Sequence, residues 1–439
     1  MNYASCDMPR RSAPIVLGIV LALTGVSAAQ PAIPVSKGGN GLGSETKSQG
    51  NGETLPKLNL RECIAIAFEK QPKLKALRAS LGSAGAAQRG LDDVRLLGQL
   101  NASYKYRKSQ AANGVCAAAA ELEQAQHEVT QAVIWTYYTS IYASEQMKVA
   151  KEAVLFIANY KDQVEKIVTD KKGTKEINQI TLNELVIRLS EGKRLLIKAQ
   201  TGQAKAQAAL REAMGVNWDY SFEVADSKLP EIDKIDLKKE TVIAHAQTRR
   251  GEVIMAGLAS DVTQLEAYVQ WSQRFRFRVE TFATGADIHS RTIPVGVQNG
   301  EYRPGAIGPE MPSELFGSRS TRYQRAWELT LRSQAVLEKT RNLVALEAEN
   351  SFIDYEAAIQ EMAEAKIEAE KADANLTFLL GVHGDKIETA ATLQKMLEYK
   401  AILARAQAAV NEANYHQITA LAALERITAG GIKVNYPDR

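Results

Sequence analysis

The chain has 439 residues, a formal net charge of +3 and 6 % aromatic residues, and 45 % of its residues are hydrophobic, largely through alanine. The nearly balanced charge argues against a nucleic-acid-binding protein, which carries a concentrated basic face. The length fits two or three ordinary domains or one long duplicated one, and the composition favours closely packed helices over a thick globular core.

The N-terminus has the pattern of a secretory signal. Two arginines precede the apolar stretch from Ala13 to Val26, and the small residues Ser27-Ala28-Ala29 follow it. We predict a signal peptide over 1–29. A membrane anchor is the alternative, although the apolar stretch is short for a membrane span. Residues 30–57 are rich in Gly, Ser, Asn and Lys, which predicts a flexible leader.

A first structural repeat is predicted over 58–217. The segment LNLRECIAIAFEKQPKLKAL predicts a short helix, a break at Pro72 and a second helix. Apolar and polar residues alternate from Leu100 to Arg107, which predicts one or more strands near 96–113. A long helical hairpin is predicted over 115–214.

The return arm of this hairpin has an apolar seam at two positions in seven, the pattern of a coiled coil. The seam consists of Leu182, Leu185, Leu189, Gly192, Leu196, Ala199, Gln203, Ala206, Leu210 and Ala213. Its small residues permit close approach between helices, so the arm is expected to pack along most of its length.

A second repeat is predicted over 235–431, after an irregular connector at 218–234. Its opening, LKKETVIAHAQTRRGEV, parallels the opening of the first repeat, and Gly251 stands where Pro72 stood. Helices are expected over 235–273, strands and a loop over 274–320, a helical hairpin over 322–429 and a C-terminal tail over 432–439. This second half leaves more room for strands than the first.

The sharpest alternation in the chain is RFRFRVE, from Arg274 to Glu280. Strands with aromatic residues on one face and charges on the other suit the wall of a barrel, apolar towards lipid and polar towards a lumen. One chain has too few strands to close a barrel, so several chains must share one if the strands lie in a membrane. The long helices also need neighbours to bury their seams.

The motifs LNLRECIAIAFEKQPKL, ALREAMG, TRRGEV and ALERITAGG, in this order behind a signal peptide, resemble the TolC-like outer-membrane efflux protein family. The resemblance covers about Leu58 to Gly431. It implies a mainly α protein with a small β part, in which duplicated antiparallel hairpins form an α-helical barrel and a few strands join a trimeric transmembrane β-barrel. It also implies an outer-membrane location with a large periplasmic portion.

The same resemblance implies the partners. A homotrimer in outer-membrane lipid would work with a periplasmic adaptor (membrane fusion) protein and an inner-membrane transporter, as a passive conduit for efflux or type I secretion of small molecules or polypeptides. The alternative is a periplasmic coiled-coil scaffold with a degenerate barrel, which the shorter first strand region favours.

Two sets of candidate residues lie in the predicted strands. The expected pore lining, which would concentrate anions, is Lys105, Arg107, Arg274, Arg276 and Arg278. The expected lipid-facing residues are Tyr104, Tyr106, Phe275 and Phe277. The alternatives are ordinary solvated strand faces and a soluble sheet packed on helices.

A third set lies at the hairpin turns, which should form the periplasmic tip. Ion pairs there could hold the entrance closed, although exposed pairs contribute little individually and a solvated turn is the alternative. The candidates for this gate are Lys171, Lys172, Glu176, Asp385, Lys395 and Glu398.

No catalytic set, metal site or cofactor site is predicted, so we do not expect an enzyme. The five histidines show no metal-ligand spacing; they are His127, His245, His289, His383 and His416. Cys63 and Cys116 could form a disulfide, but small buried thiols on helix faces are the favoured interpretation, because their spacing matches no motif.

Overall fold

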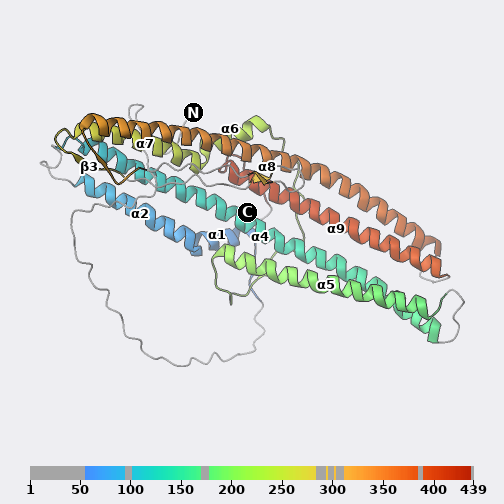
Figure 1. Cartoon of the computed structure of the whole chain (residues 1–439). Coiled ribbons are helices and arrows are strands. Elements are labelled where there is room, and N and C mark those ends of the chain that lie inside the picture. Colours follow the sequence, from blue (N-terminus) through green and yellow to red (C-terminus); the bar gives the residue numbers. More distant parts are fainter. Residues whose placement is uncertain are drawn as a thin grey trace, which may run out of the picture.

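The computed structural model describes residues 55–93, 101–169, 177–282, 293–294, 301–302, 311–383 and 389–436. The predicted signal peptide and most of the predicted leader lie outside these ranges. The described chain is mainly helical and elongated (Figure 1).

Within the described residues, two sets of four helices follow each other along the chain. The first set is α1 (Leu60–Lys70), α2 (Pro72–Asp92), α4 (Tyr104–Thr169) and α5 (Gln179–Met214), and the second is α6 (Lys239–Arg249), α7 (Gly251–Ser272), α8 (Arg319–His383) and α9 (Ala390–Ile427). Corresponding helices have 11 and 11, 21 and 22, 66 and 65, and 36 and 38 residues. The prediction of a mainly α fold with duplicated long hairpins is therefore confirmed.

Local sequence signals fix several helix ends. Asn59 and Glu62 form a capping box at α1, in which the Glu62 N–H donates to Asn59 Oδ1 over 2.8 Å. Pro72 occupies the first position of α2, where its missing N–H costs nothing. Gly215 ends α5 in the left-handed conformation, with φ of 67°.

The contacts between the helices describe a row rather than a closed bundle. On the side of the hairpin turns, the order of contacts is α5, α4, α9, α8; on the other side it is α2, α4, α7, α8. The long helices α4 and α8 run through both parts. Both of them contact α9 on the side of the hairpin turns and α7 on the other side. The row leaves α5 and α8 as its two edges in the hairpin half.

The predicted seam of α5 faces α4. Leu185, Ala206, Leu210 and Ala213 are buried, and the remaining six seam positions are half-buried, while nearly all other positions of the helix are exposed. A Cβ added at Gly192 would lie 3.0 Å from the Val154 side chain of α4, so the small residue permits the close approach. The seam prediction is confirmed.

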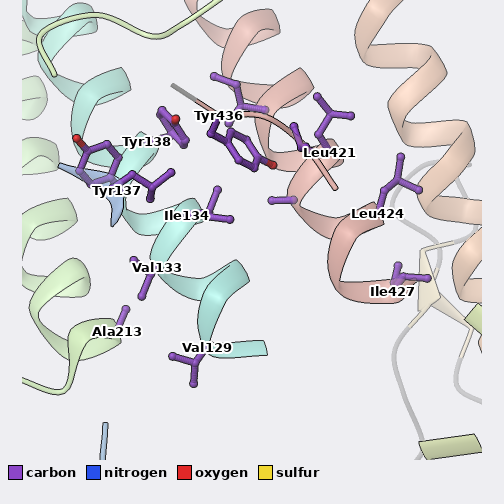
Figure 2. Packing of buried hydrophobic residues seen from close by; sticks show 14 of the residues in the cluster. Val129, Val133, Ile134, Tyr137, Tyr138, Ala213, Leu421, Leu424, Ile427 and Tyr436 are labelled. Carbon is purple, nitrogen blue, oxygen red and sulfur yellow. The ribbon is translucent and has the colours of Figure 1, made fainter. Parts of the chain in front are cut away.

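The main core lies midway along the molecule, where the two halves meet. Figure 2 shows Ile134 and Tyr138 of α4 facing Leu421 of α9 and Tyr436. The rings of Tyr138 and Tyr436 lie 5.9 Å apart. The expected tail at 432–439 is thus part of the core over the residues that the structure describes.

The strands are short and pair in three places. β1 (Lys57–Leu58) pairs in parallel with β2 (Glu223–Val224) near the main core. β3 (Arg278–Glu280) pairs with β6 (Glu314–Phe316), and β4 (Ile293–Pro294) with β5 (Glu301–Tyr302), both antiparallel. Along the sequence β4 and β5 lie between β3 and β6, and we call these four strands the strand hairpin.

The strand predicted from Leu100 to Arg107 is wrong where the structure describes it, because α4 already begins at Tyr104. Asn101 starts this helix: its Oδ1 accepts from the Ser103 N–H, and its carbonyl accepts from the Tyr104 N–H. The alternation of residue types was real, but an asparagine turn and packing against α7 select the helix.

The prediction for RFRFRVE is only partly right. The strand β3 contains its last three residues, while Arg274 to Phe277 form a turn and bend after α7. Among the described residues, no helix has a stretch that is long and apolar enough to cross a membrane. Cys63 and Cys116 are not bonded to each other, and burial raises the pKa of Cys63 to about 12.

The contact of Gly215 with the α1–α2 junction provides a stability test. A Cβ at Gly215 would lie 2.6 Å from the Cα of Gln71, and the positive φ adds strain. We expect Gly215→Ala to lower the free energy of unfolding by about 3 kcal/mol, measured by chemical denaturation.

The matched control is Gly202→Ala in the middle of α5, where an added Cβ meets no atom within 4 Å. This change should raise the stability by about 0.5–1 kcal/mol, because alanine is the better helix former. Equal effects of the two substitutions would contradict the assigned packing of Gly215.

Candidate functional site

The α5 edge of the helix row carries exposed apolar side chains in a basic setting. Its exposed large residues are Ile180, Val186, Ile187, Leu195 and Ile197. The helix has six basic and three acidic side chains. Within the described structure, α5 packs mainly on α4 and, at its C-terminal end, on α1. Its outer face is therefore free to contact another chain.

The α8 edge is complementary in charge. Between Glu349 and His383, α8 has eight acidic and two basic side chains. Its exposed apolar residues in this part are Ile353, Ile367, Phe378 and Val382. One edge is thus basic and apolar, the other acidic and apolar, and they lie on opposite sides of the same row.

The helix ends next to the two hairpin turns lie at the same end of the molecule. Tyr160 and Val164 of α4 and Leu185 of α5 form one apolar cluster with Leu393 and Met396 of α9. Figure 1 shows both hairpins ending together, far from β3.

Of the predicted gate residues, Lys395 and Glu398 lie exposed near the start of α9. The remaining four, Lys171, Lys172, Glu176 and Asp385, lie outside the described residues. The structure therefore brings together the helix ends next to the two turns, and the ion-paired gate stays a prediction.

The opposite end contains a buried ion pair that joins α4 to α7. Glu266 of α7 is 0 % exposed, and its Oε2 accepts from Arg107 over 2.6 Å. Its carboxylate also accepts from Gln110 and Gln270 and from the Phe282 N–H. The hydrogen bonds from these donors offset part of the cost of burying the carboxylate.

A second buried group anchors the hairpin. The guanidinium of Arg322, at the start of α8, donates to the carbonyls of Gln273 and Gly317, both over 2.6 Å, and to that of Arg276. Arg322 is almost fully buried, and burial lowers its pKa. Arg322 therefore fixes the backbone between α7 and β3, and it also fixes the residues that join β6 to α8.

These contacts show that three residues predicted to lie on strand faces have other partners. Arg107, expected to line a pore, lies against Glu266 and also donates to the Glu280 carbonyl over 2.7 Å. Tyr104, expected to face lipid, donates its hydroxyl to the Leu91 carbonyl over 2.9 Å. Tyr106 stacks on Tyr268 with ring centroids 5.8 Å apart. All three are helix residues, so the argument from strand faces does not apply to them.

The remaining predicted residues of this end are exposed. Lys105 lies over the Tyr106 ring, and Arg274 and Arg276 are solvated. Arg278 pairs with Glu314 across β3 and β6. Phe275 is 100 % exposed and Phe277 74 %. The structure thus gathers the arginines and phenylalanines of RFRFR on one exposed segment.

Sequence reasoning missed Glu266, Gln270 and Arg322. A usable signal was present for Glu266, because it is one of few charged residues in the apolar helix α7. Its partner could not be identified, since Arg107 is 159 residues away in the sequence.

The TRRGEV motif has a structural role. Arg250, the N-cap residue of α7, is buried and donates to Glu347 of α8 over 2.6 Å. Arg426 of α9 donates to the same carboxylate over 2.9 Å. The motif therefore ties three helices together where the two halves of the row meet.

Comparison with known proteins identifies the class of fold. No family model matches the sequence, and a search of curated proteins finds no match. The structure is similar to the outer-membrane channel OprN, with a TM-score of 0.64 and 15 % identity, over 85 % of this chain and 90 % of that chain.

Two further channels match equally well. The outer membrane protein VceC from Vibrio cholerae gives a TM-score of 0.63 at 13 % identity, over 85 % of this chain and 97 % of that one. The Campylobacter jejuni CmeC outer membrane channel gives 0.64 at 12 %, over 85 % and 86 %. The fold is that of outer-membrane channel proteins. The resemblance to the TolC-like outer-membrane efflux proteins is thereby confirmed at the level of the fold.

The buried pair of Arg107 and Glu266 yields a second test. Glu266→Ala would leave a largely buried guanidinium without its partner, and we expect a loss of about 3–5 kcal/mol in unfolding free energy. The control is Glu314→Ala, because its partner Arg278 is 66 % exposed. The control should cost less than about 1 kcal/mol. Similar losses for both variants would contradict the burial assigned to Glu266.

Proposed function

We propose that the chain is the outer-membrane channel-tunnel component of an efflux or type I secretion system, a passive conduit across the periplasm and the outer membrane. The fold supports this proposal, as do the complementary edges of the helix row. Export energy would come from an inner-membrane transporter, reached through a periplasmic adaptor protein. Small molecules or polypeptides would pass through the lumen, and the chain would act as a channel rather than as an enzyme.

The edges support a ring of identical chains. A basic, apolar α5 edge and an acidic, apolar α8 edge form a heterologous interface, and such an interface closes into a ring when the rotation between copies permits. We propose a homotrimer, in which the apolar side chains of α5 and α8 become buried between neighbours.

In this arrangement the two hairpin turns of each copy form the periplasmic entrance. Lys395 and Glu398 lie near this end and are exposed, so they can face a neighbouring copy. We propose that they act with Lys171, Lys172, Glu176 and Asp385 in ion pairs that hold the entrance closed.

One observation favours the alternative of a periplasmic scaffold. The ends of α2 and α4 are tied together by Lys108 and Asp92, 2.7 Å apart, and by the Tyr104–Leu91 hydrogen bond. A transmembrane strand needs about 9–11 residues, and the chain between Asp92 and Tyr104 is short for two of them. The first half would then contribute little to a barrel.

Membrane fractionation separates the two functions. We expect the mature protein to stay in the outer membrane after a carbonate or urea wash and to form ion-conducting pores after detergent extraction and reconstitution in planar bilayers. Release of the protein by the wash would contradict the channel and support the scaffold.

The proposed ring interface gives a fourth prediction. Arg194→Glu combined with Lys198→Glu places acidic residues opposite the acidic α8 edge, so the trimer should dissociate at least about tenfold more readily, which corresponds to 1.4 kcal/mol. Dissociation is measured by analytical ultracentrifugation in detergent.

The control reverses two exposed lysines of α4, Lys151→Glu with Lys166→Glu, because α4 lies inside the row. Adding Glu364→Lys and Glu368→Lys on α8 should restore the trimer of the α5 variant. Equal weakening by the α4 control, or no restoration, would contradict this interface.

A further inference from the structure

An exposed aromatic and basic surface surrounds the base of the strand hairpin. Phe275 and Phe277 project from the segment between α7 and β3, next to Arg274 and Arg276. Within the described ranges, the side chains of these two arginines have no acidic partner. Since the segment is not a strand, the aromatic and basic side chains are not separated onto a lipid face and a lumen face.

The backbone of this segment is nevertheless fixed. Arg322 donates to the carbonyls of Gln273 and Arg276, and the Gly317 N–H donates to the Phe277 carbonyl over 2.9 Å. Fixed display of large apolar side chains in solvent is unfavourable for a free surface and suits one that meets a partner.

A row of aromatic rings continues from this segment along the adjoining helices. Trp271 lies 5.3 Å from Tyr323, which lies 6.2 Å from Trp327. The guanidinium of Arg319 lies 3.5 Å above the Trp271 ring. On the other side, Tyr268 stacks on Tyr106. Two of the four tryptophans of the chain therefore lie at this end.

The end of α2, the start of α4 and the end of α7 lie next to this segment. The side chain of Gln273 donates to Asn101 Oδ1 and Ser103 Oγ, both over 2.9 Å, which ties the start of α4 to the end of α7. Lys108 and Asp92 tie α4 to α2. The strand hairpin thus leaves the helix row from a rigid platform whose rim carries aromatic and basic side chains.

This combination has a specific chemical preference. Tryptophan and tyrosine favour the headgroup region of a membrane, where an amphipathic ring contacts both acyl chains and water. Arginine matches phosphate geometry with two parallel N–H donors. Unpaired arginines beside exposed aromatic rings therefore fit a layer of phospholipid headgroups.

We propose that Arg274, Arg276, Phe275, Phe277 and Trp271 form a collar that binds phospholipid headgroups on the periplasmic face of the outer membrane and sets the depth of the hairpin. The proposal rests on the membrane location in the proposed function. It gives Arg274 and Arg276 a role at the lipid surface in place of the predicted pore lining.

Single-tryptophan proteins test the position of the collar. In one, Trp271 is kept and the other three tryptophans are changed to phenylalanine; in its matched control only Trp218 is kept, which is 87 % exposed and lies after α5. The mature full-length proteins are reconstituted in vesicles with lipids brominated at different acyl depths. Trp271 should be quenched most by bromine close to the headgroup, and Trp218 should not be quenched.

Two outcomes overturn the collar. In the first, the protein resists carbonate extraction but the fluorescence of Trp271 is not quenched. This result would place Trp271 away from lipid and would leave the channel proposal intact. Quenching mainly from the bilayer centre would also contradict a headgroup position. If carbonate releases the protein, the channel proposal fails, and Trp271 quenching on peripherally bound vesicles then supports or overturns the collar by itself.

The arginines are tested by flotation with vesicles that contain phosphatidylglycerol. Arg274→Gln with Arg276→Gln should weaken binding about tenfold or more. The control, Lys151→Gln with Lys166→Gln on α4, removes the same charge from exposed positions outside the proposed interface and should leave vesicle binding unchanged. Equal effects of the two pairs would overturn the proposal. Unchanged binding with altered ion selectivity would overturn it in favour of pore lining.

Discussion

The structure depends on the close packing of long helices along seams of small residues. The α5 seam lies against α4 with alanine, leucine and glycine at its contact positions, and Gly192 meets Val154 at the limit of contact. Helices of 66 and 65 residues cannot bury such faces in a compact core, so they form a row. A row has two edges, and its need for neighbours follows directly from this packing.

The duplication distributes this packing evenly. In each half, one long helix packs against three shorter ones: α4 against α1, α2 and α5, and α8 against α6, α7 and α9. The break between the first two short helices falls at Pro72 or Gly251. Both breaks lie near the main core and near the ion pairs that Glu347 forms with Arg250 and Arg426. The middle of the molecule is therefore held by specific polar contacts and a thick apolar core, whereas the hairpin arms rely on the thin seams alone.

The two ends then differ in what they can do. At the turns, apolar residues of both hairpins form one small cluster, which suits an entrance whose parts move together. At the hairpin base, the buried Glu266 and Arg322 fix the backbone, and aromatic rings and arginines cover the rim. A fixed backbone at one end and a small apolar cluster at the other fit the proposed conduit, which would be anchored in the membrane at the first end and opened at the second.

The sequence by itself determined the helices, their duplication and the α5 seam, because a periodicity of 3.5 or 3.6 residues extends over many turns and each capping residue acts locally. It could not decide the short segments. Leu100 to Arg107 and RFRFR both alternate, yet the first was decided by the asparagine turn and the contact of Arg107 with Glu266, and the second by Arg322 binding its carbonyls. The burial of the C-terminal residues through Tyr436 was likewise decided by the rings of α4. In each case the deciding partner lies far away in the sequence or belongs to another element, so only the tertiary structure could select it.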